Sequence, residues 1–199
     1  MEKGYQVVAL SPDSYQCRVF EKNTQGKVPF YLSIFEEFKS QEKFDLVLMS
    51  ESCQYISIEK GLRRCREILR PGGYLLVADY FKVKRLDEKD IPISGHSLEE
   101  YLKKVKRAGF KMINSEDITS RVSPTLDFGK EFLEDCVMPS LKIIVFTIKV
   151  YVPHLYTLGN FFLGKIVRRR VDKEFEGIFD SKLFARHRKY MIYLFQLRS

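Results

Sequence analysis

"FDLVLMSESCQYISIEKGLRRCREILRPGGYLLVADYF", residues 44–81, contains two apolar runs that flank a helical pattern, and this pattern predicts the fold class. It opens with "FDLVLMS", a nearly continuous apolar run that is typical of a parallel strand covered by helices on both faces. A helical pattern follows Ser57, the expected N-cap, and "RPGG" is expected to end that helix. "YLLVADYF", residues 74–81, is interpreted as a second buried strand. Strand, helix and strand in this order predict a parallel α/β sheet with right-handed crossovers.

The helix within this stretch should turn one apolar side toward the sheet. Its apolar residues recur every three or four positions and are Ile58, Leu62, Cys65 and Leu69. The charged residues that the same pattern turns toward water are Arg63, Arg64 and Glu67. The spacing therefore predicts an amphipathic helix that packs on the sheet.

Strand and helix patterns also alternate outside this stretch. Strands are expected at residues 5–10, 28–35, 110–118 and 190–197, and helices at residues 14–23 and within 96–110. Tyr15, Val19 and Phe20 form the expected apolar side of the first helix. Ser97 and Glu100 have the spacing of a capping box at the start of the later helix.

This rhythm breaks at residues 128–170, a mostly apolar segment that is too long for a plain connection in a compact domain. We predict a helical insertion that covers the open end of the sheet as a lid, within a single domain spanning residues 1–199. Its longest charge-free run, residues 150–164, has 15 residues, which is short for a membrane-spanning helix. The aromatic residues expected to line a wall for an apolar molecule are Phe132, Phe146, Tyr151, Tyr156, Phe161 and Phe162.

The net charge of +8 is concentrated near the end of the chain, because residues 165–199 hold ten Lys or Arg against four Asp or Glu. This distribution gives no reason to expect a nucleic-acid partner. "RRR" at residues 168–170 is either a peripheral membrane or anionic-ligand patch or a solvated face. The cysteines are widely spaced and the histidines lack the spacing of a metal site. We therefore expect neither a disulfide framework nor a metal, no transmembrane segment, and a cytoplasmic location.

Taken together, "FDLVLMSESCQYI", "REILRPGGYLLVADYF" and a capped helix ending in "AGF" before a strand resemble the class I S-adenosylmethionine-dependent methyltransferases. The two strands of residues 44–81 match the fourth and fifth strands of that fold, and residues 5–10 and 28–35 match the second and third. The resemblance implies a Rossmann-like α/β sheet, S-adenosylmethionine as the cofactor, and methyl transfer to a small, hydrophobic acceptor. Nothing in this chain matches the family's first strand or its glycine-rich loop, since Gly4 is the only glycine before Gly26. We therefore expect the chain to be N-terminally incomplete.

The resemblance also implies which strand ends face the cofactor. The cofactor-binding candidates are Ala9, Leu10, Ser11, Ser33, Ile34, Phe35, Met49 and Ser50. The family's second strand usually ends in an acidic residue that binds the ribose hydroxyls, but here Ala9 or Leu10 has that place and Asp13 lies beyond "SP". Ser33 could form a hydrogen bond with the cofactor and Phe35 could stack on it, and both are equally interpretable as packing residues.

The candidate catalytic residues follow the strand that ends at Ser50. Glu51 would favour a nearby cation or accept a proton from a hydroxyl, or it is a surface acid at the end of the strand. Gln54 and Tyr55 could orient a substrate, although Tyr55 also fits a ring at the edge of the core. Asp79 ends the next strand and has the same two interpretations, as a site residue or as a surface acid.

Three function hypotheses remain open on the sequence, and the third makes the aromatic insertion and "RRR" a membrane-surface anchor. The first is an S-adenosylmethionine-dependent methyltransferase acting on a small, apolar molecule. The second is a non-catalytic, methyltransferase-like binding or partner protein that has lost cofactor binding, which the missing loop and missing acidic contacts favour. A frame upstream of residue 1 that encodes an apolar strand and a Gly-x-Gly loop would support the first.

Overall fold

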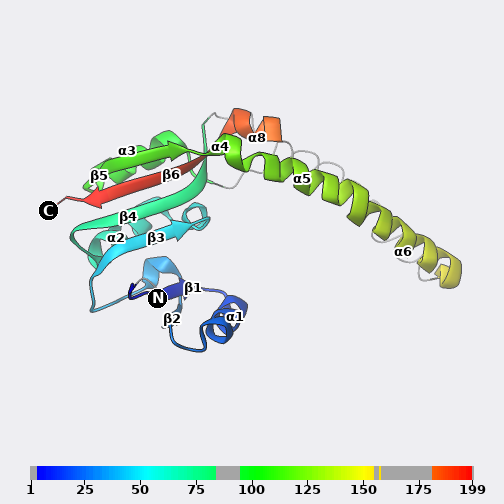
Figure 1. Ribbon diagram of the computed structural model, residues 1–199, viewed down its shortest axis with the longest axis horizontal. Coiled ribbons are helices and arrows are strands. Elements are labelled where there is room, and N and C mark those ends of the chain that lie inside the picture. The colour runs from blue at the N-terminus through cyan, green and yellow to red at the C-terminus, as the bar shows by residue number, and fades with distance from the viewer. Residues whose placement is uncertain (1–3, 84–94, 155–156, 158–180, 199) are drawn as a thin grey trace. The chain divides into compact units, whose positions relative to one another are not determined.

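A computed structural model describes residues 4–83, 95–154, 157 and 181–198 (Figure 1). The chain divides into two compact units, and each is described by itself. The first unit consists of Met1–Asp79, Gly95–Glu116 and Ile192–Ser199, and the second of Tyr80–Ser94 and Asp117–Met191. Several strands therefore begin in one unit and end in the other.

The larger described sheet has four strands in the order β3-β4-β6-β5. The bounds are Phe44–Ser50 for β3, Leu69–Lys82 for β4, Phe110–Asp117 for β5 and Arg188–Leu197 for β6. β3 and β4 are parallel, as the sequence predicts. β6 runs against β5, because Arg198 N–H donates to Gly109 O and Ile118 N–H donates to Tyr190 O, and Figure 1 shows the two arrows opposed. The α/β fold is confirmed, and its sheet is mixed.

The first two strands form a separate parallel sheet, in which β1 (Ala9–Ser11) pairs with β2 (Phe30–Leu32). Both are three residues long, which is shorter than the sequence pattern predicts. Tyr5, within the predicted strand at residues 5–10, is 70% exposed. Among the described strands, β1 and β3 are therefore each paired on one side.

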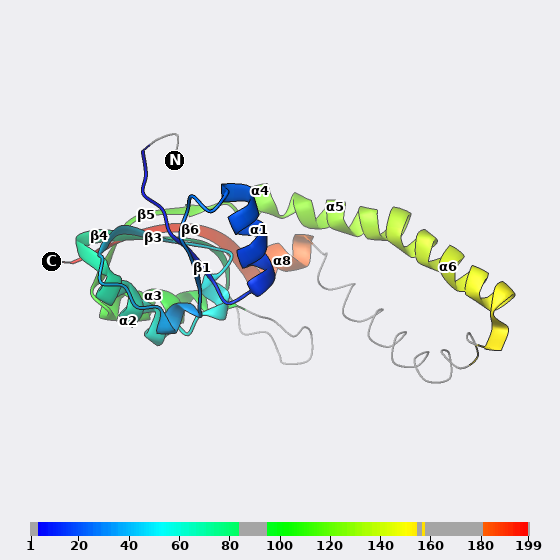
Figure 2. The ribbon, with the colours of Figure 1, turned by 90° about the horizontal axis from the view of Figure 1, so that it is seen from below.

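Two amphipathic helices cover one face of the larger sheet, α2 (Ile58–Ile68) and α3 (Leu98–Arg107) (Figure 2). The Ser97 hydroxyl caps α3 by accepting from Glu100 N–H, as the capping box predicts. Fully buried side chains beneath these helices include Leu75, Val77 and Phe195. Each buried aliphatic or aromatic side chain of this size stabilises the fold by about 1.5–3 kcal/mol. This packing makes the covered face the core of the first unit.

The prediction that "RPGG" ends the first of these helices is confirmed, because α2 ends at Ile68 with Leu69 as its C-cap, directly before Arg70. The predicted start of the next strand at Tyr74 is too late, since Leu69 to Gly73 are already part of β4. Gly72 has a φ of +76°, and a Cβ on Gly73 would lie 2.9 Å from Arg70 O, so the two glycines allow an irregular start of the strand. The pairing of β3 with β4 shifts at this point, between Phe44 and Leu46.

Two predictions about exposed and buried helix sides are also wrong. Arg64 does not face water, because its side chain is only 15% exposed and its guanidinium donates to Glu36 O. α1 (Ser14–Thr24) buries none of its residues, and Tyr15 is 66% exposed. Phe20 of the predicted apolar side packs against Phe30, with 5.4 Å between the ring centroids.

The opposite face of the larger sheet is apolar and open along β3. Leu46 and Leu48 alternate with the buried Val47 and Met49, and they are 47% and 61% exposed. β3 is also the edge strand in the described order. This strand was predicted to be covered on both faces, and the described helices cover one.

The second unit contains the helical part of the predicted insertion. Its helices are α4 (Thr119–Val122), α5 (Pro124–Phe132), the π-helical η3 (Leu133–Val137), α6 (Met138–Tyr151) and α8 (Ser181–His187). Tyr156, Phe161 and Phe162 lie outside the described residues. The single domain over residues 1–199 and the lid role of residues 128–170 stay predictions. None of the helices in the described residues is long and apolar enough to cross a membrane.

Candidate functional site

The carboxyl ends of β3 and β4 lie side by side. Ser50 pairs with Ala78, and Glu51 N–H donates to Ala78 O at 2.9 Å. Glu51 therefore stands next to Asp79, as expected for neighbouring parallel strands. Glu51 has a φ of +50°, a left-handed conformation that few non-glycine residues adopt and that is common at functional sites.

Asp79 is fully buried under the loop that follows β3. Its Oδ2 accepts from Gln54 N–H at 3.0 Å, and the Gln54 side-chain amide lies 3.5 Å from its Oδ1. A buried carboxylate needs such donors, because removal from water is otherwise costly. Asp79 therefore holds the loop on the end of β4 and is covered by it, while Glu51 on the neighbouring strand is exposed.

His96 holds the same loop from another side. The loop contains the short helix η2 (Cys53–Tyr55), and the His96 Nε2 lies 3.0 Å from Cys53 O and 2.9 Å from Ile56 O. Because both partners are carbonyl oxygens, this nitrogen carries the proton and donates. The His96 ring also stacks on Tyr101 of α3, with an interplanar angle of 6°.

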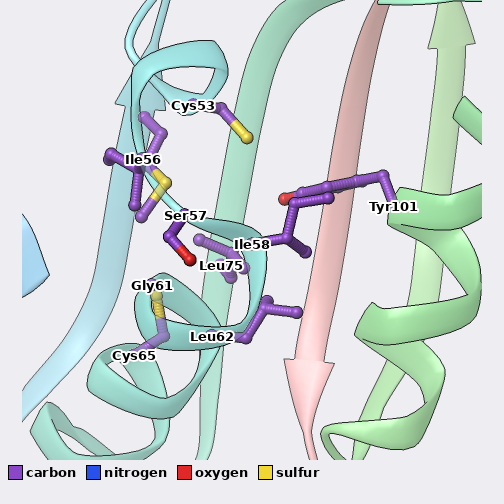
Figure 3. Close-up of a pocket in the computed structure, with 10 residues that line it drawn as sticks. Cys53, Ile56, Ser57, Ile58, Gly61, Leu62, Cys65, Leu75 and Tyr101 are labelled. Carbon is purple, nitrogen blue, oxygen red and sulfur yellow. The ribbon is translucent and has the colours of Figure 1, made fainter. Parts of the chain in front are cut away.

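A small cavity lies below this loop, between η2, α2 and α3 (Figure 3). Its volume is about 10 Å³, which is on the scale of one water molecule. The Cys53 thiol and the Tyr101 hydroxyl point toward this space in Figure 3, and Met49 also lines it. The cavity is a packing defect of the core, too small for a cofactor or a substrate.

The Cys53 thiol is a buried and unreactive group. Its side chain is 3% exposed, and burial raises its pKa to about 12, against the opposing effect of the hydrogen bond from Tyr101. Burial also raises the pKa of Tyr101 well above its usual value. Neither group ionises near neutral pH, so the Cys53 thiol is an inert group of the core.

The carboxyl ends of β1 and β2 bring two of the cofactor candidates together. Ser33 N–H donates to Ser11 O at 3.2 Å, so both serines lie at the same end of the small sheet. The Ser11 hydroxyl donates to Gln16 Oε1, and the Ser33 hydroxyl donates to Ile34 O. Both hydroxyls thus serve local turns, and either would have to exchange a partner to bind a ligand.

Asp13, the nearest acid to the end of β1, has a structural role. Its Oδ1 accepts from Tyr15 N–H at 2.7 Å and from Gln16 N–H at 3.3 Å, which caps α1. A carboxylate used in this way is not positioned as a separate ribose contact.

The remaining predicted residues are placed as follows. Tyr55 is 76% exposed, so its interpretation as a ring at the edge of the core is wrong. Met49 is 5% exposed and faces the core, which leaves its backbone for contact with a ligand. Ser50 and Ile34 are exposed, and Ala9, Leu10 and Phe35 are half-buried. Their assignment to the cofactor, and that of Glu51, Gln54 and Tyr55 to catalysis, stay predictions.

Two residues that build this end of the sheet, Glu36 and His96, are not indicated by the sequence pattern. Glu36 takes over the capping of α2. Ser57 occupies the N-cap position, but its side chain makes no capping hydrogen bond, and Glu36 Oε1 accepts from Ser57 N–H at 2.9 Å instead. Glu36 belongs to η1 (Phe35–Glu37), so this bond ties the turn after β2 to α2. The spacing of the histidines indicates no metal site, and it does not reveal that His96 binds the loop after β3. Its place directly before Ser97, the N-cap of α3, is the one sequence feature that points to a fixed position. No group of three or more His, Cys, Asp or Glu in the described part of the chain is arranged to hold a metal.

Comparison with known proteins gives one family match, described as a methyltransferase domain, over residues 1–77. No curated protein matches the chain. Among solved structures, the cyclopropane synthase MmaA2 from Mycobacterium tuberculosis is 15% identical, with a TM-score of 0.64 over 98% of this chain and 71% of that one. A putative sarcosine dimethylglycine methyltransferase from Galdieria sulphuraria is 14% identical, with a TM-score of 0.61 over 95% and 68%.

A third similar structure is the cyclase SpnF, which is 18% identical with a TM-score of 0.63. The alignment covers 97% of this chain and 66% of the cyclase. This chain covers 60% of the length of two structures of an O-methyltransferase segment of StiE. It therefore spans about two thirds or less of the length of these structures and of SpnF. At these identities the likeness establishes the fold, and the reactions in the names are those of the other proteins.

Proposed function

We propose that the chain contributes to S-adenosylmethionine-dependent methyl transfer to a small, hydrophobic acceptor. Residues 1–77 match the methyltransferase domain family, and the described fold is that of the class I S-adenosylmethionine-dependent methyltransferases. The observation that supports this proposal most directly is the pair of parallel strand ends at Glu51 and Asp79, with Glu51 exposed and in a left-handed conformation.

The residues at the strand ends fit two parts of this cofactor, the sulfonium and the nucleoside, and they offer a charged group only to the sulfonium. At the end of β3, Ser50 and Glu51 are exposed, and a carboxylate there favours the cationic sulfonium of the cofactor. At the ends of β1 and β2, Ser11 and Ser33 offer hydroxyls for the nucleoside. When bound, S-adenosylmethionine supplies an activated methyl group and a neutral leaving group.

The work left to the protein is mainly positioning. Holding the acceptor in line with the methyl group can supply about 7 kcal/mol or more in well-oriented cases. Asp79 and His96 contribute by fixing the loop that carries Gln54 and Tyr55. Glu51 accepts a proton if the acceptor is a hydroxyl or an ammonium. The apolar composition of residues 128–170 supports a hydrophobic acceptor.

The test is a pair of calorimetric titrations with S-adenosylmethionine, which is cationic at sulfur, and S-adenosylhomocysteine, which is neutral there. We expect the chain to bind both. Glu51→Gln should weaken binding of the cationic ligand by about fivefold or more and leave the neutral ligand unchanged, because only the first loses a Coulomb attraction. Glu37→Gln, another exposed acid, is the matched control and should change neither.

A second candidate is the non-catalytic binding or partner protein. It is favoured by the division of the strands into two sheets and by the use of Asp13 as a helix cap. Failure of the folded chain to bind either ligand would reject the proposed methyl transfer by this polypeptide and support this candidate. Binding of both ligands with no effect of Glu51→Gln would instead keep the cofactor and remove Glu51 from its contact.

A further inference from the structure

The helix α6 exposes apolar side chains around its whole circumference. None of its residues, Met138 to Tyr151, is buried. Ile143 is 67% exposed, Phe146 is 66% exposed and Ile144, on another side, is 53% exposed. A helix that is hydrophobic all round is stable in water only when something covers it, and an apolar surface of this kind marks an interaction site.

Charge separates this helix from the segment before it. Pro124–Val137, which comprises α5 and η3, carries Asp127, Lys130, Glu131, Glu134 and Asp135, and Lys130 pairs with Glu134. α6 carries only Lys142 and Lys149, and the sequence has no Asp or Glu from Cys136 to Val171. An acidic and solvated segment is thus followed directly by a basic and apolar one.

The length of α6 excludes one way of covering it. At about 1.5 Å per residue, a 14-residue helix is about 21 Å long, shorter than the roughly 30 Å of bilayer hydrocarbon. It can lie in a membrane surface but cannot cross it. Lys142 and Lys149 are seven positions apart, so they lie on the same side of the helix, where both can reach the lipid headgroups.

We propose that α6 is a peripheral docking element for an anionic lipid surface, lying flat with its apolar side chains in the acyl region and its two lysines at the headgroups. The two lysines of α6 complement the negative charge of an anionic lipid surface, which favours lipid as the partner. A second copy of the helix would bring lysines together with no acid in the same segment to pair with them. The proposal does not depend on methyl transfer, because it rests on exposure and charge in the second unit alone.

The experiment is co-sedimentation of the purified chain with phosphatidylcholine vesicles, with and without phosphatidylglycerol. We expect binding to the anionic vesicles that weakens as salt is added. Ile144→Asp should reduce the bound fraction roughly tenfold or more, because Ile144 lies on the side of α6 opposite the two lysines and its apolar side chain is lost from the acyl region. Lys142→Gln should reduce binding to anionic vesicles by about fivefold and leave binding to neutral vesicles unchanged.

Two controls separate docking by α6 from non-specific binding through any exposed apolar side chain. Tyr5→Asp removes an exposed apolar side chain from the first unit, and Phe128→Asp removes one from the acidic α5. Both variants should bind as the parent chain does, and circular dichroism should show all variants folded. The proposal is overturned if the chain binds no vesicle, if the controls lose binding equally, or if Ile144→Asp abolishes self-association of a chain that does not bind vesicles.

Discussion

The carboxyl ends of β3 and β4 differ from those of β1 and β2 in what holds them in place. At the first pair, buried Asp79 and partly buried His96 fix a loop over a core that α2 and α3 cover. At the second pair the strands are three residues long and the polar side chains serve local turns. Where helices cover the sheet, buried side chains fix the loop at the strand ends. Where they do not, the residues at the strand ends are held only by local hydrogen bonds.

The largest expected difference between the two ends lies in their cores. Leu75→Ala, in β4, should lower the free energy of unfolding by about 3 kcal/mol, because Leu75 is fully buried and the change leaves a cavity. Leu10→Ala, in the half-buried β1, should cost less than about 1 kcal/mol. Urea denaturation measures both. Equal losses would show that the two sheets share one core.

Loss of either of two carboxylates that accept backbone N–H groups, Asp79 and Asp13, should lower the stability of the fold by the next largest amount. Asp79→Ala leaves the Gln54 N–H without its acceptor under the loop and should cost about 2 kcal/mol. Asp13→Ala removes an exposed N-cap and should cost about 1 kcal/mol. Thermal unfolding of the two variants ranks them, and Asp79→Asn, which keeps one acceptor oxygen, should fall between Asp79→Ala and the parent chain. A larger loss at Asp13 would reverse the comparison.

A smaller effect is expected where α2 meets the loop after β3. A Cβ on Gly61 would lie 2.5 Å from Ile56 Cγ2, so Gly61→Ala must displace that side chain. Overpacking costs about 1–3 kcal/mol, and alanine returns about 1 kcal/mol of helix propensity. We therefore expect a net loss near 1 kcal/mol by chemical denaturation. Gly26→Ala is a poor match because its φ is +66°, so Lys60→Ala, at an exposed position of α2, is the control.

The smallest effect concerns a carboxylate outside both strand ends. The Lys189 ammonium and the Thr119 hydroxyl hold the pKa of Asp117 at about 2, below its ordinary 3.8. Because the folded pKa is the lower one, the ion pair stabilises the fold above pH 3.8 and is lost as the pH falls toward 2. The side chain is 38% exposed, so solvent screening reduces the effect to about 1 kcal/mol or less. Asp117→Asn should flatten stability between these pH values, and an unchanged pH profile would contradict the assignment.

The sequence predicts best where pattern and packing agree. β3 begins and ends at the predicted residues because a run of apolar residues stops at Ser50 and Glu51. The start of β4 was placed too late because Gly72 and Gly73, which were expected in a turn, belong to the irregular start of the strand. Arg64 and His96 were misjudged because their partners, Glu36 O and the Cys53 and Ile56 carbonyls, are 28 to 43 residues away in the chain. Helical periodicity contains no information about such distant acceptors.

The candidate site shows the same limit. Register along two parallel strands correctly predicts that Glu51 and Asp79 are neighbours. It does not predict that a loop covers one carboxylate and leaves the other exposed, since this depends on how Gln54 folds back. The direction of β6 was equally hidden, because a short apolar strand has the same pattern in either orientation.

The open long edge of β3 has a practical consequence for handling the protein. Among the residues that the structure describes, no strand pairs with the outer side of β3, and leucines stand at alternate positions along it, so another extended chain can add there by main-chain hydrogen bonds. Concentrated solutions should therefore thicken or precipitate through ladder growth at this edge. A lysine in place of Leu48 would act as a gatekeeper there and give a more tractable sample for crystallisation or spectroscopy.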